Sequence, residues 1–197
     1  MRHAASILAL AFALFADIPA NAQEPNPVDC IDRLIGEELG SFIYNDYLAK
    51  IDASEPGFLK QPEVRRQLVE ATKRCASEFS DDQETLSLIT FGGVGVHLHR
   101  QSTALLTRIG FDAKQLDDLF GPPLSQMRLK MKDIWEIDFP DELRPQALTL
   151  LAEIGAKGGW DDDYATVVFT AHIAGLTGTL AADQALERAA NADSAAP

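Results

Sequence analysis

The chain has 197 residues, of which 46% are hydrophobic and 24% charged, and this is the composition of a folded globular protein rather than a disordered or collagen-like one. It carries 17 Lys and Arg against 30 Asp and Glu, a formal net charge of −13 at pH 7. Because every phosphate contact needs a cation, this excess of acid argues against nucleic acid as a partner, and also against an anionic membrane surface.

The N-terminus has the three parts of a secretory signal peptide. Arg2 supplies the positive charge, residues 4–16 form an uncharged apolar run, and Ala20-Asn21-Ala22 is a small-x-small cleavage site. The apolar run is shorter than the roughly 20 residues of a membrane-spanning helix, although a retained membrane anchor is the alternative. We therefore expect residues 1–22 to be removed, the protein to be periplasmic or secreted, and the mature chain not to insert stably into a membrane.

The only two cysteines, Cys30 and Cys75, should form a disulfide in an oxidising compartment. Neither belongs to a Cys-x-x-Cys motif, and no histidine lies at metal-ligand spacing from either, so a metal site or a reactive thiol is the less favoured interpretation. Closing a loop of about 45 residues contributes roughly 4 kcal/mol to stability in the chain-entropy model.

Apolar residues recur every three or four positions along most of the mature chain, which predicts helices throughout. Residues 23–28 should form an extended leader, and Asp29 should then cap the first amphipathic helix. A break at residues 54–61 precedes a second helix that should begin at Pro62. The two helices would form a hairpin that the disulfide crosses.

A Ser-x-x-Gln capping box at residues 80–83 predicts the start of a third helix. Residues 85–98 contain three glycines and no ionisable side chain except His97. Gly110, at the end of the pattern, is typical of a helix C-terminus. A strand over residues 86–91 followed by a glycine turn is the alternative.

Shorter helices, separated by proline and glycine, should follow in the middle of the chain. Asp112 should cap a helix that residues 121–123, Gly-Pro-Pro, bring to an end, and residues 124–135 and 141–156 should form two more. One of these segments carries the single local basic patch, which consists of Arg128, Lys130 and Lys132.

The last helix should run from Asp163 to about Ala189, before a disordered tail at residues 191–197. Residues 164–182 have no charged side chain apart from His172, so a membrane span is the alternative to a buried helix. Threonine, histidine and glycine in the middle of this segment lower its hydropathy and favour the buried helix.

Small residues four positions apart in this last helix, such as Ala171 and Gly175, would let another helix approach closely. The expected neighbour is the glycine-bearing third helix, through Gly93 or Gly95. The predicted fold is thus all-α: a single domain at residues 29–190 that forms a bundle of six or seven helices, with a disulfide across its N-terminal hairpin.

The main candidate functional residues are three histidines that could form a buried polar cluster, His97, His99 and His172. On a strand His97 and His99 would share a face and could bind a metal ion together, whereas on a helix they lie about 200° apart. Because we favour the helix, we expect neither a metal site nor a cofactor, and a hydrogen-bonded core histidine is the commoner outcome. The adjacent acids Asp117 and Asp118 should point apart and be solvated.

Two classes of function remain, because the sequence contains no nucleotide-binding, hydrolase or calcium-loop motif. The favoured class is a protein that works by binding a partner, as an inhibitor, an immunity protein or a chaperone-like accessory. The acidic surface would steer a basic protein or peptide toward it, and a small apolar ligand is the second choice. The other class is a cell-envelope hydrolase whose histidines and carboxylates converge only in the fold.

Overall fold

The computed structural model describes residues 26–49, 57–135 and 140–194, and every regular element in these ranges is helical. The elements in chain order are α1 (Pro27–Ala49), η1 (Gly57–Lys60), α2 (Pro62–Cys75), α3 (Gln83–Arg108), α4 (Lys114–Gln126), α5 (Met131–Trp135), η2 (Asp141–Leu143), α6 (Arg144–Gly158) and α7 (Asp162–Ser194). The predicted all-α fold is confirmed, but α7 extends to Ser194, so residues 191–194 are helical and not part of a disordered tail. The signal peptide and residues 23–25 of the leader lie outside the described residues.

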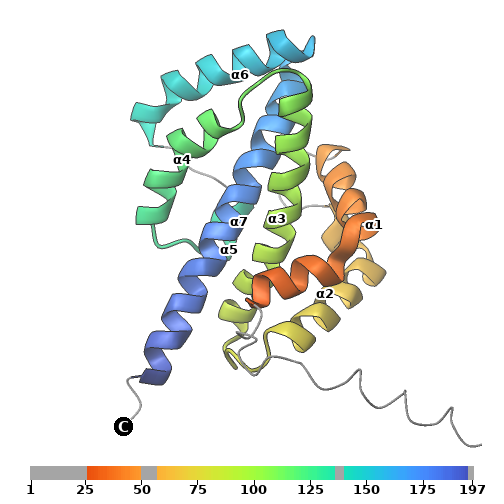
Figure 1. Ribbon diagram of the computed structural model, residues 1–197, viewed down its shortest axis with the longest axis vertical. Helices are drawn as coiled ribbons and strands as arrows, with labels where there is room; N and C mark the ends of the chain where they lie inside the picture. The colour runs from red at the N-terminus through yellow and green to blue at the C-terminus, as the bar shows by residue number, and fades with distance from the viewer. Residues whose placement is uncertain (1–25, 50–56, 136–139, 195–197) are drawn as a thin grey trace, which may run out of the picture.

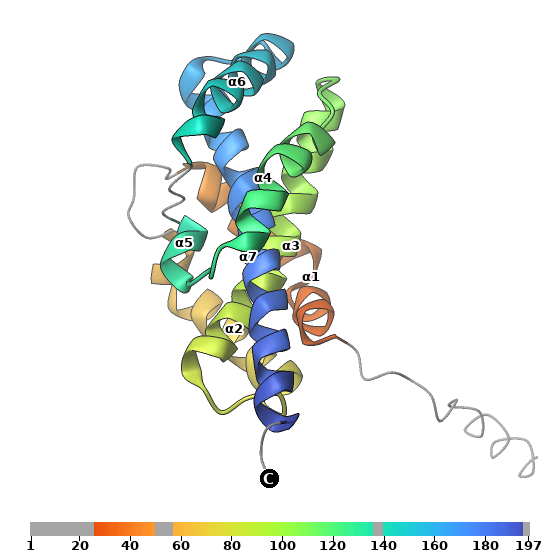
Figure 2. The same ribbon diagram turned by 90° about the vertical axis from the view of Figure 1, so that its left-hand side faces the viewer.

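The long helices α3 and α7 lie side by side and form the centre of the bundle (Figure 1). Helices α1 and α2 cover one side of this pair, α4 and α5 lie on another, and α6 crosses one end of α7 (Figures 1 and 2). Because α3 and α7 touch elements from every part of the chain, side chains on these two helices can meet residues far away in the sequence.

The first helix begins earlier than predicted and is bent. Asn26, rather than Asp29, caps it, since the Val28 backbone N–H donates to Asn26 Oδ1 at 2.9 Å. Residues 27 and 28 are therefore helical and not part of an extended leader, because Pro27 suits a first helical position. The bend is at Gly36, whose φ of 65° and ψ of 176° interrupt the helix and would strain any residue with a Cβ.

The disulfide between Cys30 and Cys75 is confirmed, with a Cα–Cα distance of 5.7 Å. This distance is in the usual range for a disulfide. The bond ties the end of α2 to the first turn of α1 and indicates an oxidising compartment.

Residues 86–91 are helical, so the alternative of a strand and a glycine turn is wrong. Helix α3 is capped by Asp82, whose carboxylate accepts from the Thr85 N–H at 2.8 Å, and not by the predicted capping box that starts at Ser80. Its C-terminus follows the prediction, because Gly110 has a φ of 77° and the Phe111 N–H donates to Leu106 O at 3.0 Å.

Glycines bring α3 and α7 into backbone contact. A Cβ placed on Gly95 would lie 2.7 Å from Gly175 O, and a Cβ on Gly175 would lie 2.5 Å from the His99 nitrogen. The predicted close approach is confirmed for Gly95. Gly93 faces α1 instead, where its Cβ would lie 2.4 Å from Ile31.

Helix α7 is long and apolar enough to cross a membrane, since its most apolar window of 18 residues has a mean hydropathy of 1.4. However, 72% of its most apolar window is buried inside the protein. This burial is what the core helix of a folded domain shows.

The expected break at residues 121–123 is wrong, because α4 continues through Pro122 and Pro123 to Gln126. Its buried residues Leu116, Phe120 and Leu124 keep a four-residue spacing across the prolines. The expected single helix at residues 124–135 is also wrong, since residues 124–126 belong to α4, residues 127–130 are not helical, and α5 covers only Met131–Trp135. The Gln184 side chain of α7 accepts from the Leu129 N–H at 3.2 Å and donates to Met127 O at 2.8 Å. These two hydrogen bonds use backbone groups between α4 and α5 that a continuous helix would need.

Candidate metal centre

Two histidines and an aspartate from three helices meet at one point of the bundle. His99 lies on α3, Asp117 on α4 and His172 on α7. Asp117 Oδ1 accepts from His99 Nε2 at 2.9 Å and from His172 Nε2 at 3.0 Å. The two imidazole rings are 4.4 Å apart between centroids. We call these three residues the His–Asp cluster.

The glycine contact between α3 and α7 explains why the two histidines meet. Gly175 touches the backbone of His99, and His172 is three residues before Gly175 on the same face of α7. Asp117 comes from the first turn of α4, which the buried neighbours Leu116 and Phe120 anchor to the core. The cluster is thus a product of helix packing and not of a local sequence motif.

A hydrogen bond at its other ring nitrogen fixes the His172 ring. His172 is 0% exposed, and its Nδ1 lies 3.1 Å from Ser102 Oγ on α3. With Nε2–H donating to Asp117, Nδ1 of the neutral ring carries no proton, and the single Ser102 hydroxyl proton is shared between this nitrogen and Leu98 O at 2.7 Å. A metal ion at Nε2 would take the other tautomer, in which Nδ1–H donates to Ser102 Oγ, and such a hydrogen bond is what orients metal-ligating histidines.

Ser102, His172 and Asp117 have the residue types of a hydrolase triad, but this serine cannot act as a nucleophile. Ser102 is 0% exposed, and its Oγ lies 2.7 Å from Leu98 O, one turn earlier on the same helix. A substrate carbonyl could not reach it without opening the contact between α3 and α7. The hydroxyl therefore serves to position His172.

Asp117 and His172 have the net charges that a metal ion favours in its ligands. Burial opposes the charge on Asp117, but the hydrogen bonds from His172 and His99 outweigh it and lower the pKa of this carboxyl to about 2. Burial also lowers the pKa of His172 below its ordinary value of 6.5. At neutral pH the cluster therefore offers a carboxylate and a neutral imidazole as ligands.

The geometry of the cluster is close to that of a metal site. All three ligand atoms, two imidazole nitrogens and one carboxylate oxygen, lie within 4.8 Å of one another. Ligands of a tetrahedral Zn²⁺ ion with bonds of 2.0–2.1 Å are about 3.3 Å apart, so the two contacts of Asp117 Oδ1 with the imidazole nitrogens, at 2.9 and 3.0 Å, would lengthen by a few tenths of an ångström around an ion. The side chains of His99 and Asp117 are 31% and 35% exposed, which leaves one side of the site open to solvent.

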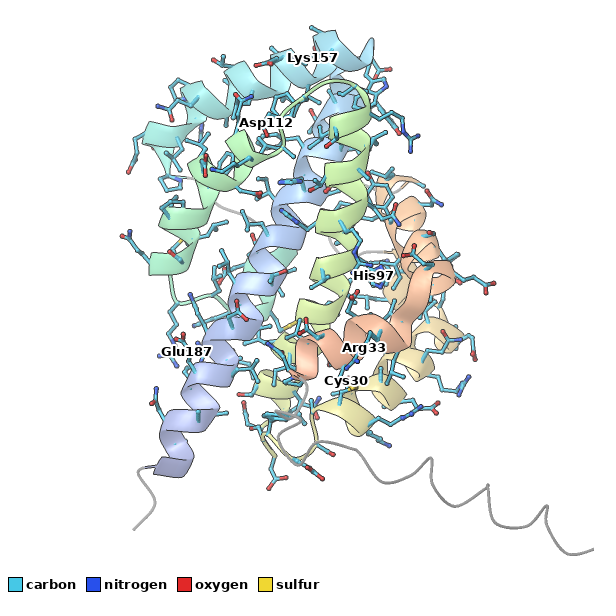
Figure 3. The ribbon with its side chains drawn as sticks, viewed as in Figure 1. Cys30, Arg33, His97, Asp112, Lys157 and Glu187 are labelled. Carbon is cyan, nitrogen blue, oxygen red and sulfur yellow. A yellow bond between two sulfur atoms is a disulfide. The ribbon has the colours of Figure 1, made fainter. Side chains whose placement is uncertain are left out.

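His97 lies apart from this cluster, on the side of α3 that faces α1 (Figure 3). Its Nε2 is 2.9 Å from Asp32 Oδ1, and Arg100 forms an ion pair with the same carboxylate at 2.6 Å. The ring packs on Gly40, where a Cβ would lie 2.3 Å from His97 Nδ1. The three candidate histidines thus form two separate sites, as their two-residue spacing on a helix requires.

Asp117 is the member of the cluster that the sequence does not predict, because adjacent acids on a helix are expected to point apart and be solvated. Only Asp118 behaves in that way, forming an exposed ion pair with Lys114. The signal was present in the apolar pattern, since Asp117 follows the buried Leu116 and lies at the edge of the buried face of α4. The partner on α3 or α7 could not have been identified from that pattern.

The basic patch is placed in and after the connection between α4 and α5. Arg128 and Lys130 are exposed there, and the side chain of Lys132 is outside the described part of the chain.

Comparisons with protein-family models, with curated proteins and with solved structures find no match to this chain.

Proposed function

We propose that this protein is exported to the periplasm and binds a divalent transition metal ion, with Zn²⁺ as the ion whose preferences fit best, through His99, Asp117 and His172. The observation that carries the proposal is the convergence of two imidazole nitrogens and a carboxylate oxygen within 4.8 Å, from three different helices. Zn²⁺ accepts this combination of ligands, and a fourth position would face solvent. The signal-peptide pattern and the disulfide support the location.

Metal binding at this point would clamp α3, α4 and α7 together. The unfolded chain holds His99 and His172 73 residues apart with no fixed geometry, so the ion would bind the folded state preferentially. Free ion at a hundred times its Kd would then stabilise the fold by about 2.7 kcal/mol.

Metal-dependent hydrolysis is the second candidate function, and the partial exposure of His99 and Asp117 favours it. A metal ion held by three protein ligands with one open position lowers the pKa of a bound water and so supplies a nucleophile at neutral pH. This is the envelope hydrolase that the sequence left as its alternative. The binding of a basic protein or peptide partner, which the net charge of −13 supports, stays a prediction.

Calorimetric titration of the mature, disulfide-bonded protein with Zn²⁺ at neutral pH tests the proposal. The wild type should bind one ion per chain, and H99A and D117N should each lower the affinity at least a hundredfold. D118N is the matched control, since it removes a neighbouring exposed carboxylate that is outside the cluster. Equal affinities for wild type, D117N and H99A would refute the site, and the absence of binding would make the cluster a purely structural hydrogen-bond network.

A further inference from the structure

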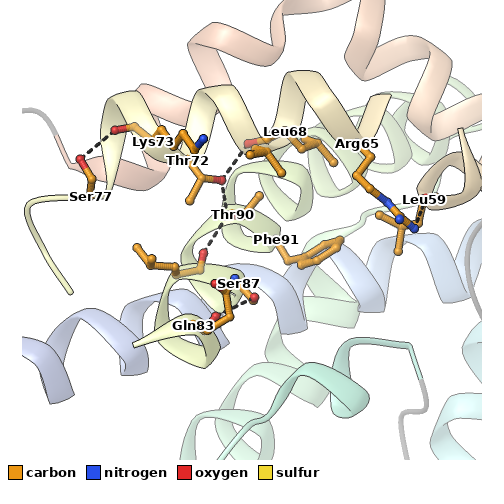
Figure 4. A pocket seen from close by; sticks show the side chains of 12 residues that line it. Leu59, Arg65, Leu68, Thr72, Lys73, Ser77, Gln83, Ser87, Thr90 and Phe91 are labelled. Atoms are coloured by element: carbon orange, nitrogen blue, oxygen red, sulfur yellow. Dashed lines mark hydrogen bonds between the residues drawn. The ribbon is translucent and has the colours of Figure 1, made fainter. Parts of the chain in front are cut away.

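A groove with a volume of about 340 Å³ lies between α2 and α3, where η1 closes one end (Figure 4). It belongs to neither the His–Asp cluster nor the His97 site. This volume is in the range of small-ligand pockets. The groove exists because α2 has its main contacts with α1, to which the disulfide ties it, and touches α3 less closely.

The two ends of the groove differ in polarity. Leu59 and Phe91 line the end near η1, where the Arg65 guanidinium is bonded to Leu59 O, whereas Lys73, Ser77 and Gln83 line the other end (Figure 4). An occupant that matches both ends has an apolar tail and a polar head. The groove is thus amphipathic along its length.

The charge of the lining is opposite to that of the whole protein. Arg65 and Lys73 both line the groove, and none of its lining residues is acidic, although acids outnumber bases by 30 to 17 in the chain. Neither Arg65 nor Lys73 has an ion-pair partner among the described residues, but Arg65 donates to Leu59 O at 3.1 Å, which holds its guanidinium at the η1 end, whereas Lys73 lies beside Ser77 and Gln83. The head group that this surface attracts is therefore an anion beside Lys73.

The floor of the groove needs no polar group from a ligand. Thr72 on α2 and Thr90 on α3 are 2.6 Å apart at their hydroxyl oxygens, and each also lies 2.7 Å from the carbonyl oxygen of the preceding turn. Their hydroxyl protons are already used within the protein, so these residues present mainly methyl groups to an occupant. An alkyl chain meets this requirement better than a peptide, whose backbone polar groups would be left without partners.

We infer that this groove binds a free medium-chain fatty acid, with the carboxylate at Lys73 and the alkyl chain directed toward Leu59 and Phe91. Arg65 and Lys73 are eight residues apart on α2, a rise of about 12 Å, which an extended chain of about ten carbons spans. The inference does not rest on metal binding.

Calorimetry with decanoate below its micellar concentration, compared with decan-1-ol and decyltrimethylammonium, tests the inference. Decanoate should bind with a 1:1 stoichiometry, three- to tenfold more tightly than the alcohol, and the cation should be the weakest. K73Q should lower the affinity for decanoate three- to tenfold and leave that for decan-1-ol unchanged. R74Q is the matched control, because it removes a charge from the next residue of α2, which does not line the groove.

A second variant, V69E, tests whether the ligand lies in the groove even if K73Q perturbs α2. Val69 lines the groove and is 48% exposed, so V69E adds an anion to its edge without disturbing the core, and it should weaken decanoate binding. Equal binding of decanoate and the alcohol would overturn the inference, as would binding to phosphatidylglycerol vesicles without binding to decanoate. A dimer that V69E dissociates would assign this face to a second copy of the chain instead.

Discussion

The contact between α3 and α7 positions the His–Asp cluster, and Gly175→Ala perturbs it most directly. The new Cβ would lie 2.5 Å from the His99 nitrogen, 2.9 Å from Gly95 O and 2.9 Å from His99 Cα. All three are backbone atoms, so no flexible side chain can move aside. The helices must separate at this point, and His99 must move away from His172.

The size of the effect is the difference between two opposing contributions. Overpacking a core contact costs about 1–3 kcal/mol, and the upper part of this range applies where backbone atoms collide. Replacing glycine by alanine within a helix returns up to about 1 kcal/mol. We therefore expect a net loss of about 1–2 kcal/mol, which lowers the Tm of a domain of this size by roughly 2–8 °C.

Thermal unfolding of the mature protein, followed by circular dichroism, measures this loss. Gly121→Ala is the matched control, since Gly121 is also in a helix but has nothing within 4 Å of a new Cβ. The control should melt at or above the wild-type temperature. If Gly175→Ala melts as the control does, α3 and α7 are not in backbone contact and the packing explanation of the cluster fails.

Three further predictions concern the disulfide, the pH dependence and the N-terminus. Replacing Cys30 and Cys75 by serine should cost about 2–5 kcal/mol in denaturant unfolding, and an unchanged midpoint would contradict a structural disulfide. Folding lowers the pKa of His172 below 6.5 and that of Asp117 from 3.8 to about 2. Each group therefore stabilises the fold when the pH is above the pKa that the group has in the unfolded chain, and this stabilisation is lost as the pH falls through the pKa of the folded state. The Tm should thus decrease below pH 6.5 and again between about pH 4 and 2, and the second decrease should be smaller in D117N, whereas a constant Tm down to pH 4 would refute the assignment. Mass spectrometry of exported protein should find Gln23 as the first residue and no alkylatable thiol, and an intact Met1 would exclude export by cleavage.

Much of the helical framework could be predicted from the sequence, because the apolar periodicity and the glycine signals report local structure, whereas the predicted caps at Asp29 and Ser80 are wrong. The Gly110 terminus and the contact of Gly95 with Gly175 follow from such signals. The prolines at 122 and 123 misled the prediction, because the buried face of α4 is apolar on both sides of them and tertiary packing maintains the helix.

The candidate site could be predicted only in part. A pairing of His172 with a histidine of the third helix follows from the close packing of two uncharged helices. Which histidine faces α7 depends on helix rotation, and the structure selects His99 and turns His97 toward Asp32. The rotation of α4, which brings Asp117 to the same point, depends on contacts across the chain that no local pattern encodes.

The most direct test of metal binding is to observe the imidazole nitrogens during a Zn²⁺ titration. Long-range ¹H–¹⁵N correlation spectra of ¹⁵N-labelled mature protein separate the signals of its histidines, and D118N provides a second sample with the cluster intact. Saturation at one equivalent should shift the Nε2 signals of His99 and His172 and leave those of His97 in place. Unchanged His99 and His172 signals at saturating Zn²⁺, or equal shifts of all three histidines, would contradict a metal centre at the junction of α3, α4 and α7.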